Sequence, residues 1–393
     1  MIRRLTAQDV PRANELFSIA FEQPPEGPFE PDGSRTHRWA AFADDTNEMM
    51  STLTVTDFTV QFDGNICKMG GVGGVATLPQ YRRTGGIRGC FETMLPELYA
   101  DGYDFSYLYP FSTGYYRKFG YECCVQKYLT TVDLGLLSPP KTDGTLRMAE
   151  RENTMKDAIR AIDAVWEQRY NMTVQHQAED YDWTENQEPA VKQKFTYVYF
   201  SAEGTPKAYT TFVKKEQGNE CDCVCRHFFF TDKEGFAGLM NLFKSLSSDH
   251  RAVKFALPAD PAMQYLLPEW SLGAASWSIQ PAGMARVVNV KRVLEKAAYH
   301  GEGSVVLAVR DPQIAENNRR FAVRFAGGRA VSVEETQETP DAALSISALS
   351  ALVCGVCDFA DAAKWMEGIQ VCRPSGALPQ VFYRKPMMIA DFF

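Results

Sequence analysis

Two arginines and two glycines in one short turn form the group of residues in this chain that most clearly could do chemistry. Arg82 and Arg83 are followed by Gly85 and Gly86, and an amphipathic helix is predicted directly after them. The first amides of a helix have no partner inside it, and the helix dipole favours an anion there. Arginines add positive charge, and glycines let a ligand approach the backbone closely. The turn therefore predicts a binding site for a pyrophosphate group.

The elements around this turn must position it. The apolar run Val72–Thr77 predicts a strand that Pro79 ends, and Asp63-Gly64 predicts a hairpin before it. After the turn, apolar residues recur at helical spacing, namely Ile87, Cys90, Phe91, Met94, Leu95 and Leu98. Phe105–Tyr109 then predicts another strand, and Val125–Val132 is expected as the last one. Over residues 1–135 the expected order of elements is β-α-β-β-β-α-β-α-β.

This order and the turn resemble the GNAT family of acetyltransferases. The family's pyrophosphate loop reads R/Q-x-x-G-x-G/A, and here it reads Arg82-x-x-Gly85-x-Ile87, with isoleucine in place of the third small residue. The resemblance implies that acetyl-CoA binds as co-substrate and that no metal is needed. The residues expected to contact acetyl-CoA are Val75, Ala76, Thr77, Arg82, Arg83, Thr84, Gly85, Gly86 and Ile87.

Tyr116 is the expected catalytic residue of this unit. In GNAT enzymes a tyrosine on the short helix after the fifth strand, just before an F-G-[FY] turn, commonly sits near the thioester sulfur, and Tyr116 precedes Phe119-Gly120-Tyr121 in this way. A tyrosine hydroxyl with a pKa of ~10 can donate a hydrogen bond or a proton to a leaving thiolate with a pKa of ~8.5. Tyr115 is the competing candidate, because only the spacing to Phe119 separates the two.

Residues 136–283 are interpreted as a second, diverged copy of the same fold. The segment Arg147–Arg169 repeats the pattern of the N-terminus, with a short strand, a polar turn and a helix. The turn equivalent to the pyrophosphate loop, however, carries Asp232 and Glu234 at the helix start. These carboxylates stabilise the helix end themselves and repel a second anion. We therefore expect this copy to lack a CoA loop and to wall the acceptor pocket.

Residues 284–393 follow a different pattern. Met284–Glu295 opens it, Gly327-Gly328 predicts a hairpin, and Ser350–Val356 begins an apolar helix. This unit looks similar to the sterol-carrier-protein-like domain. The expected fold class is therefore α+β, with two tandem GNAT units followed by a sterol-carrier-protein-like α/β domain. That layout resembles the enhanced intracellular survival (Eis) family over the whole chain.

The C-terminal residues carry a separate prediction. Met387–Phe393 is mostly apolar, so a frayed end would expose it to water, and we expect it to dock inside the protein. In the Eis family the terminal carboxylate reaches the active site as general base, which implies this role for Phe393. A carboxylate with an ordinary pKa of ~3.5 is a weak base for an ammonium, so it would act after desolvation, through water, or by holding the cationic acceptor. Burial of the tail for packing alone is the alternative.

Composition limits the remaining function classes. The chain has 393 residues, of which 45% are hydrophobic and 23% charged, as in globular proteins of two or three domains. The net charge of −8 argues against a nucleic-acid partner. No apolar run reaches membrane-spanning length and no signal-peptide core is present, so no membrane partner and a cytoplasmic location are expected. Cys354 and Cys357 lack a second ligand pair at zinc spacing, and the cysteines are interpreted as small buried residues.

Together these features predict an acetyl-CoA-dependent N-acetyltransferase. By resemblance, the acceptor is a small polycationic amine such as an aminoglycoside, and the chain forms a homo-oligomer, a hexamer in the family. Three alternatives stay open, and one of them is a GNAT relic without turnover. The third unit could make the chain a lipid or small-molecule binding protein, or the acceptor could be a protein lysine, because the fold alone does not choose the acceptor.

Overall fold

A computed structural model describes residues 1–22, 35–217, 220–260, 265–266 and 273–391. The Pro, Gly and Glu residues of Gln23–Gly33 predict a loop, and this segment and the terminal Phe393 lie outside the described part of the chain. The structure divides into two compact units. One contains residues 1–125, 282–385 and 389–393, and the other contains residues 126–281 and 386–388.

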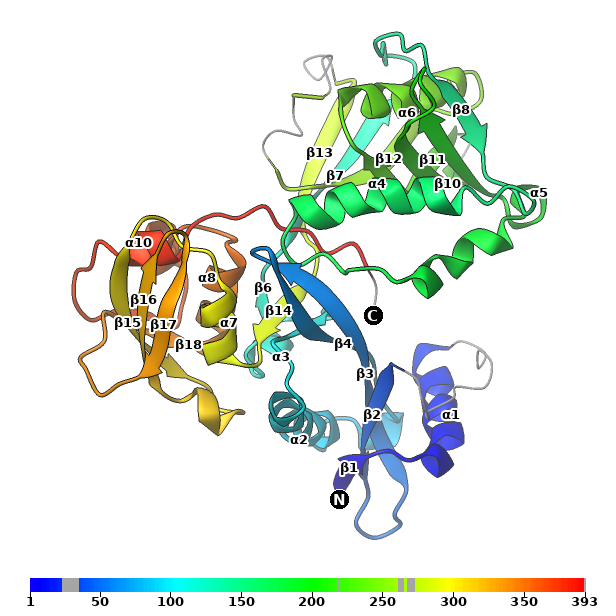
Figure 1. Ribbon diagram of the computed structural model, residues 1–393. Coiled ribbons are helices and arrows are strands. Elements are labelled where there is room, and N and C mark those ends of the chain that lie inside the picture. The colour runs from blue at the N-terminus through cyan, green and yellow to red at the C-terminus, as the bar shows by residue number, and fades with distance from the viewer. Residues whose placement is uncertain (23–34, 218–219, 261–264, 267–272, 392–393) are drawn as a thin grey trace. The chain divides into compact units, whose positions relative to one another are not determined.

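The first sheet of the larger unit is built almost as the sequence predicts (Figure 1). Its strands, in spatial order, are β1 (Ile2–Arg4), β2 (Thr36–Phe42), β3 (Met49–Phe62), β4 (Asn65–Thr77), β5 (Phe105–Leu108), β14 (Met284–Val287) and β6 (Glu122–Cys123). Helix α1 (Val10–Phe21) and helix α2 (Gly86–Ala100) cover opposite faces. Alternate β2 residues show this, because Trp39 packs with α2 residues and Ala40 with α1 residues.

One strand lies in a different sheet from the one expected. We expected Val125–Val132 to end the first unit, and this is wrong, because β7 (Gln126–Asp133) pairs with β12 (Ala252–Pro258) and β13 (Ala275–Pro281) of the second sheet. The place beside β5 is taken instead by Met284–Val287, which was expected to open the third unit. Alternating apolar residues predict a strand, but they do not say which of two similar sheets it joins. The structure thus divides near residues 125 and 281, where boundaries at 135 and 283 were expected.

The second unit repeats the architecture of the first sheet. Its strands, in spatial order, are β13 (Ala275–Pro281), β7, β12 (Ala252–Pro258), β11 (Glu220–Phe230), β10 (Pro206–Gln217), β9 (Lys194–Phe200) and β8 (Thr145–Met148). Its helices are α4 (Lys156–Arg169), α5 (Pro189–Lys192) and α6 (Lys233–Ser245), with a 3₁₀ segment at Ala178–Asn186. A core rich in phenylalanine packs α6 on this sheet, with Phe228 and Phe255 stacked 4.1 Å apart between ring centroids.

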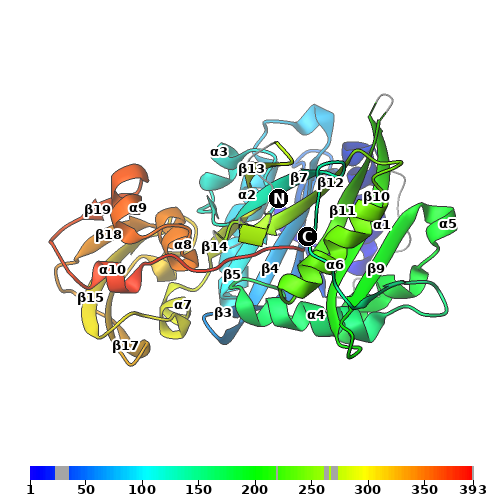
Figure 2. The same cartoon turned by 90° about the horizontal axis from the view of Figure 1, so that it is seen from above.

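The C-terminal part of the larger unit forms a third sheet (Figure 2). Its strands, in spatial order, are β17 (Arg329–Glu335), β16 (Arg320–Ala326), β15 (Gly303–Arg310), β18 (Ala342–Ser345) and β19 (Ile369–Val371). The helices here are α7 (Val290–Lys296), α8 (Ile346–Cys354), α9 (Phe359–Trp365) and α10 (Leu378–Val381). The predicted hairpin at Gly327-Gly328 is confirmed, because both residues have positive φ between β16 and β17.

The cysteines are free thiols in the described structure. Cys90, Cys223 and Cys354 are buried, as expected of small core residues, whereas Cys372 is exposed. Burial raises the pKa of Cys90 to about 12, so this thiol stays protonated at neutral pH. Within the described ranges no group of three or more His, Cys, Asp or Glu side chains could hold a metal ion. No described helix has both the length and the apolar character needed to cross a membrane.

A buried carboxyl group in the second unit gives that unit a pH-dependent stability. Asp163 on α4 is 8% exposed and accepts a hydrogen bond of 2.8 Å from the Tyr209 hydroxyl. Burial raises the pKa of Asp163 to about 7, while the bond from Tyr209 lowers it. Between pH 4 and 7 the folded chain therefore keeps a proton that the unfolded chain releases. Stability from this group is full at the acid end of that window and is lost as pH rises through 7.

Asp163→Asn should remove this dependence, because asparagine still accepts the bond from Tyr209 but cannot ionise. We expect the variant to melt at a higher temperature than the natural chain at pH 8, with the difference closing at pH 5, as measured by calorimetry. Glu179→Gln, at an exposed position nearby in sequence, serves as the control. Equal melting temperatures of the Asp163→Asn variant and the natural chain at both pH values would contradict this prediction.

Candidate active site

The site begins where strands β4 and β5 stop pairing. They run parallel, with Met69–Val72 opposite Phe105–Leu108. Strand β5 ends at Leu108, but β4 continues to Thr77. Beyond Val72, therefore, no strand in the described part of the chain pairs with that edge of β4. Free amides and carbonyls on a strand edge can bind an extended ligand as a further strand would.

A β-bulge shapes this free edge. The register with β3 shifts between Thr52, opposite Ala76, and Thr54, opposite Gly73. Gly74 inside the bulge has φ of +56°, and a Cβ there would lie 3.1 Å from the Thr54 hydroxyl oxygen. A bulge bends its strand and leaves a residue outside the regular ladder. The expected contact residues Val75, Ala76 and Thr77 follow it directly.

The side chains of these three residues point in different directions. Ala76 is buried against α1 residues, and Val75 is half-buried against the α2 core. The hydroxyl of Thr77 lies 3.0 Å from that of Ser51 on β3. At this position the backbone is therefore the part best placed to meet a ligand, and the side chains mainly anchor the strand.

The predicted turn leads straight into helix α2. Gly89 donates to the Gly85 carbonyl at 3.0 Å, so the amides of Gly86, Ile87 and Arg88 precede the helical ladder. Gly85 has φ of +95° and Arg83 has φ of +69°, which is the left-handed region. The Thr84 hydroxyl donates to the Tyr81 carbonyl at 2.7 Å and holds the turn in shape. A 15-residue helix thus starts directly after a tight basic turn.

The positive charge of this turn is available to a ligand. Arg82, Arg83 and Arg88 are exposed, and none of them forms an ion pair with a described residue. Arg88 was not among the residues expected to contact acetyl-CoA, although three arginines within residues 82–88 are a signal that could have found it. Burial raises the pKa of Tyr115 and Arg88 lowers it, which places that arginine near α3 (Thr113–Arg117).

The two residues after Gly85 pack helix α2 against the sheet through their side-chain positions. A Cβ on Gly86 would lie 2.6 Å from the Ser51 hydroxyl oxygen and 3.3 Å from the Ala41 Cβ, so glycine lets the helix start sit directly on the sheet. Ile87 is buried in the core beneath α2. Because that side chain faces the core, only the Ile87 amide is presented to the turn. This accounts for an isoleucine where the family pattern has a small residue.

Tyr116 lies on α3, in the segment that follows β5. It is 2% exposed and packs edge-on against Phe91 of α2, with 5.9 Å between ring centroids. Among the described residues none forms a hydrogen bond with its hydroxyl. Burial raises the pKa of Tyr116 well above its usual value. Tyr115 beside it is half-buried, and the two rings meet at 85°. The two candidate tyrosines therefore differ in burial, because Tyr116 is buried and Tyr115 is only half-buried.

The C-terminal segment docks at the end of β5. Ile389 is buried, and its Cδ1 atom would lie 3.8 Å from a Cβ on Gly283. The same Cβ would lie 3.6 Å from the Leu108 carbonyl. Burial raises the pKa of Tyr109, and the Asp391 carboxylate raises it further. The chain thus reaches the strand end at which β4 and β5 separate, two residues before Phe393.

The equivalent helix in the second unit has its own anion. The Asp232 carboxylate accepts from the Gly235 amide at 2.9 Å and so caps α6. Lys207 lies 2.6 Å from the same carboxylate, and Glu234 accepts from the Tyr199 hydroxyl at 3.0 Å. The helix start is therefore occupied by the side chains that the sequence pointed to.

The comparisons with known proteins match three segments of the chain. Residues 1–124 and 166–287 each match an acetyltransferase (GNAT) domain family. Residues 290–386 match a sterol carrier protein domain family. No curated protein matched the chain.

Three solved structures share the fold over the whole chain. A probable N-acyltransferase from Enterococcus faecalis V583, described as a conserved protein of unknown function, has 22% identity and a TM-score of 0.84, covering 100% of this chain and 99% of its own. A GCN5-related N-acetyltransferase from Anabaena variabilis has 17% identity and a TM-score of 0.83, with both chains fully covered. Eis1 from Mycobacterium abscessus also has 17% identity, with a TM-score of 0.79 and both chains fully covered.

The chain therefore belongs to the GNAT acetyltransferases, with the Eis-like arrangement of two GNAT domains followed by a sterol carrier protein domain. GNAT domains use acetyl-CoA as co-substrate.

Proposed function

We propose that this chain transfers the acetyl group of acetyl-CoA directly to the amine of a small polycationic acceptor. The observation that carries the proposal is the free edge of β4 after Val72, which runs through the bulge into the basic turn and the start of α2. A pantetheine arm extended along this edge would place its thioester near the end of β5, and its pyrophosphate would meet the amides of Gly86, Ile87 and Arg88.

Each bond change in this reaction has a group to assist it. The acceptor nitrogen attacks the thioester carbonyl carbon, a C–N bond forms and the C–S bond breaks. The amine proton passes to a base, for which we propose the Phe393 carboxylate acting through water. Negative charge develops on the departing sulfur. Because burial keeps Tyr116 protonated, its hydroxyl serves there as a hydrogen-bond donor to the thiolate, without giving up its proton.

The assay that tests this proposal measures free thiol released from acetyl-CoA against aminoglycosides, polyamines and a lysine peptide. Thiol release with the aminoglycosides or polyamines that greatly exceeds release with the peptide supports the proposal. Release only with the peptide would favour a protein-lysine acetyltransferase. No release with any amine, together with lipid and no CoA in the purified protein, would overturn the proposal in favour of a binding protein.

The role proposed for Phe393 has its own test. Phe393→Ala keeps a carboxylate at residue 393, whereas deletion of Phe393 moves it back by one residue. We expect the deletion to lower kcat about 100-fold, in line with the loss of a positioned base, and the alanine variant to lose much less. Equal losses in the two variants would mean that the ring matters and that the tail serves packing alone.

Assembly into a homo-oligomer is part of the same proposal. The family resemblance suggests a hexamer, and sedimentation of the purified chain measures it directly. If the chain is a monomer and still acetylates its acceptor at the full rate, activity does not require assembly.

A further inference from the structure

The turn after Tyr116 is held by two side chains that lie far along the chain from it, Arg286 and Gln313. The Phe119 carbonyl accepts from Arg286 Nε at 2.7 Å, and the Lys118 carbonyl accepts from Gln313 Nε2 at 2.9 Å. Arg286 lies on β14, and Gln313 follows β15 in the sterol carrier protein domain. Both acceptors lie within three residues of Tyr116.

The turn itself transmits this constraint to Tyr116. Its carbonyl accepts from the Phe119 amide at 2.9 Å and from the Tyr121 amide at 3.4 Å. Gly120 between them has φ of +79°, and a Cβ there would lie 3.0 Å from Arg286 Nε and 2.6 Å from Ile346 Cγ2. Only glycine fits, because the turn lies directly against the guanidinium and α8. A shift of Arg286 therefore moves the backbone that orients Tyr116.

Arg286 is fixed in turn by Asp311. The guanidinium is 0% exposed and donates through Nη2 to both Asp311 oxygens, at 2.7 and 2.9 Å. Its Nη1 donates to the Val287 carbonyl at 2.9 Å. Each of its three nitrogens is thus bonded, and the planar guanidinium is held in one orientation.

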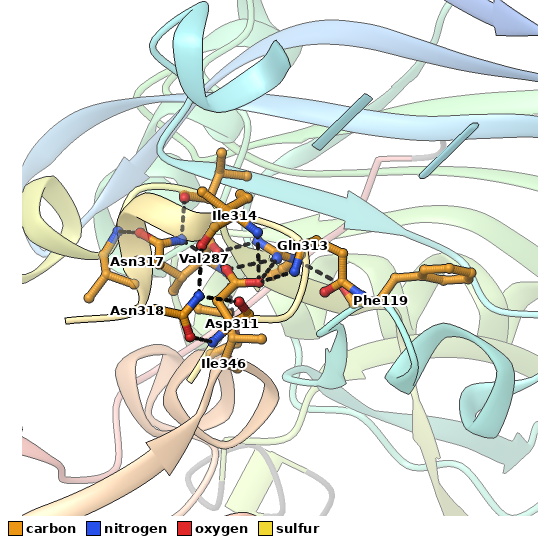
Figure 3. Close-up of polar contacts among 12 residues, drawn as sticks. Phe119, Val287, Asp311, Gln313, Ile314, Asn317, Asn318 and Ile346 are labelled. Atoms are coloured by element: carbon orange, nitrogen blue, oxygen red, sulfur yellow. Dashed lines mark hydrogen bonds and ion pairs between the residues drawn. The ribbon is translucent and has the colours of Figure 1, made fainter. Parts of the chain in front are cut away.

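Asp311 belongs to a closed polar cluster (Figure 3). It accepts from the Gln313 amide at 3.0 Å, the Ile314 amide at 3.2 Å and the Asn317 side chain at 2.9 Å. Asn317 also donates to the Val288 carbonyl at 2.8 Å. The loop that orients Asp311 therefore also positions Gln313.

A buried ion pair of this kind contributes little net stability, because desolvating both charges offsets their attraction. Such a pair can instead fix the geometry of its surroundings, and the Arg286–Asp311 pair fixes the turn after Tyr116. We propose that Arg286 and Gln313 are positioning residues for Tyr116, so that the sterol carrier protein domain forms part of the catalytic frame. This inference rests on the proposed function, since it needs Tyr116 to assist acetyl transfer.

Two mild substitutions test it. Gln313→Ala removes one bond to the turn and leaves the buried ion pair in place. Arg286→Lys keeps the charge beside Asp311 but cannot make all four bonds. We expect kcat to fall about fivefold in Gln313→Ala and about tenfold or more in Arg286→Lys, with KM for acetyl-CoA changed less than about twofold. Gln370→Ala, at an exposed position of the same domain, should leave both constants unchanged.

A double-mutant cycle shows whether the effect passes through Tyr116. In the Tyr116→Phe background, Gln313→Ala should change the rate less than about twofold. The rate of hydrogen exchange at the amides of residues 113–121 should rise in Gln313→Ala. This measurement needs no amine substrate, so it does not depend on which amine the enzyme acetylates.

The outcomes separate this inference from the proposed function. Two results would overturn the positioning role and leave acetyl transfer intact. One is an unchanged kcat and unchanged hydrogen exchange in Gln313→Ala. The other is a loss of kcat from Gln313→Ala that is equally large in the Tyr116→Phe background. If Tyr116→Phe alone leaves kcat unchanged, the catalytic role of Tyr116 fails, and the positioning role fails with it. The inference is supported if Gln313→Ala and Arg286→Lys both lower kcat and if Gln313→Ala no longer lowers it in the Tyr116→Phe background.

Discussion

Tyr116→Phe is expected to lower kcat by roughly 10²–10³, the usual effect of removing one hydrogen-bond donor from a developing negative charge. KM for acetyl-CoA should stay nearly constant, because the ring that packs on Phe91 is retained. Tyr115→Phe is the matched control, since it removes a neighbouring hydroxyl that is half-buried. Steady-state kinetics with a panel amine measure both. A larger loss in Tyr115→Phe would assign the role to the other tyrosine.

The pH dependence of kcat tests the role of Tyr116 in a second way. Burial raises the pKa of Tyr116, so the hydroxyl stays protonated through the range in which an ordinary tyrosine ionises. The natural enzyme should therefore show no loss of kcat from this group up to pH 10. An alkaline decline below pH 10 that disappears in Tyr116→Phe would contradict the donor role.

Substitution of the two adjacent glycines should separate ligand binding from packing. In Gly85→Ala the new Cβ meets no atom within 4 Å, but φ of +95° is strained for alanine. Relaxation of that strain reorients the following amides, so we expect KM for acetyl-CoA to rise about tenfold, with a stability loss of about 1–2 kcal/mol. In Gly86→Ala the Cβ clashes with Ser51, so the larger effect should be on melting temperature.

Gly376→Ala is the control for both variants, because its Cβ meets nothing within 4 Å and its φ is not positive. Thermal melting with and without CoA measures the two effects separately. If Gly85→Ala keeps its affinity for CoA while Gly86→Ala loses it, the pyrophosphate contact lies further along the helix than we propose.

The sequence carried the local features of the site well. The arginines, Gly85 and the apolar spacing of α2 predicted the helix start, because each residue acts through local backbone geometry. Asp232 predicted the capped helix of the second unit for the same reason, and its bond to Gly235 confirms that cap. Tyr116 could be placed only by its spacing to Phe119, and the structure adds its burial.

Long-range features could not be obtained in this way. The segment Gln126–Asp133 predicts a strand, but its partners lie more than a hundred residues away. The bond from Arg286 to Phe119 spans 167 positions. Hydrophobic periodicity carries information over about one or two turns, so neither pairing has a local signal. Arg88 was not predicted because it follows the turn, on a helix, where an exposed arginine usually lies in solvent; the structure places it near Tyr115.

The place of β14 between β5 and β6 also has a consequence during synthesis. Ribosomes add about 5–20 residues per second, and domains usually fold as they emerge. Here the first sheet lacks an interior strand until residue 287 has left the ribosome, although its other strands are complete by residue 123. The nascent chain therefore holds an open edge beside β5 while some 160 further residues are made. Such an edge is a natural target for chaperones, and it predicts that residues 1–135 expressed alone will aggregate.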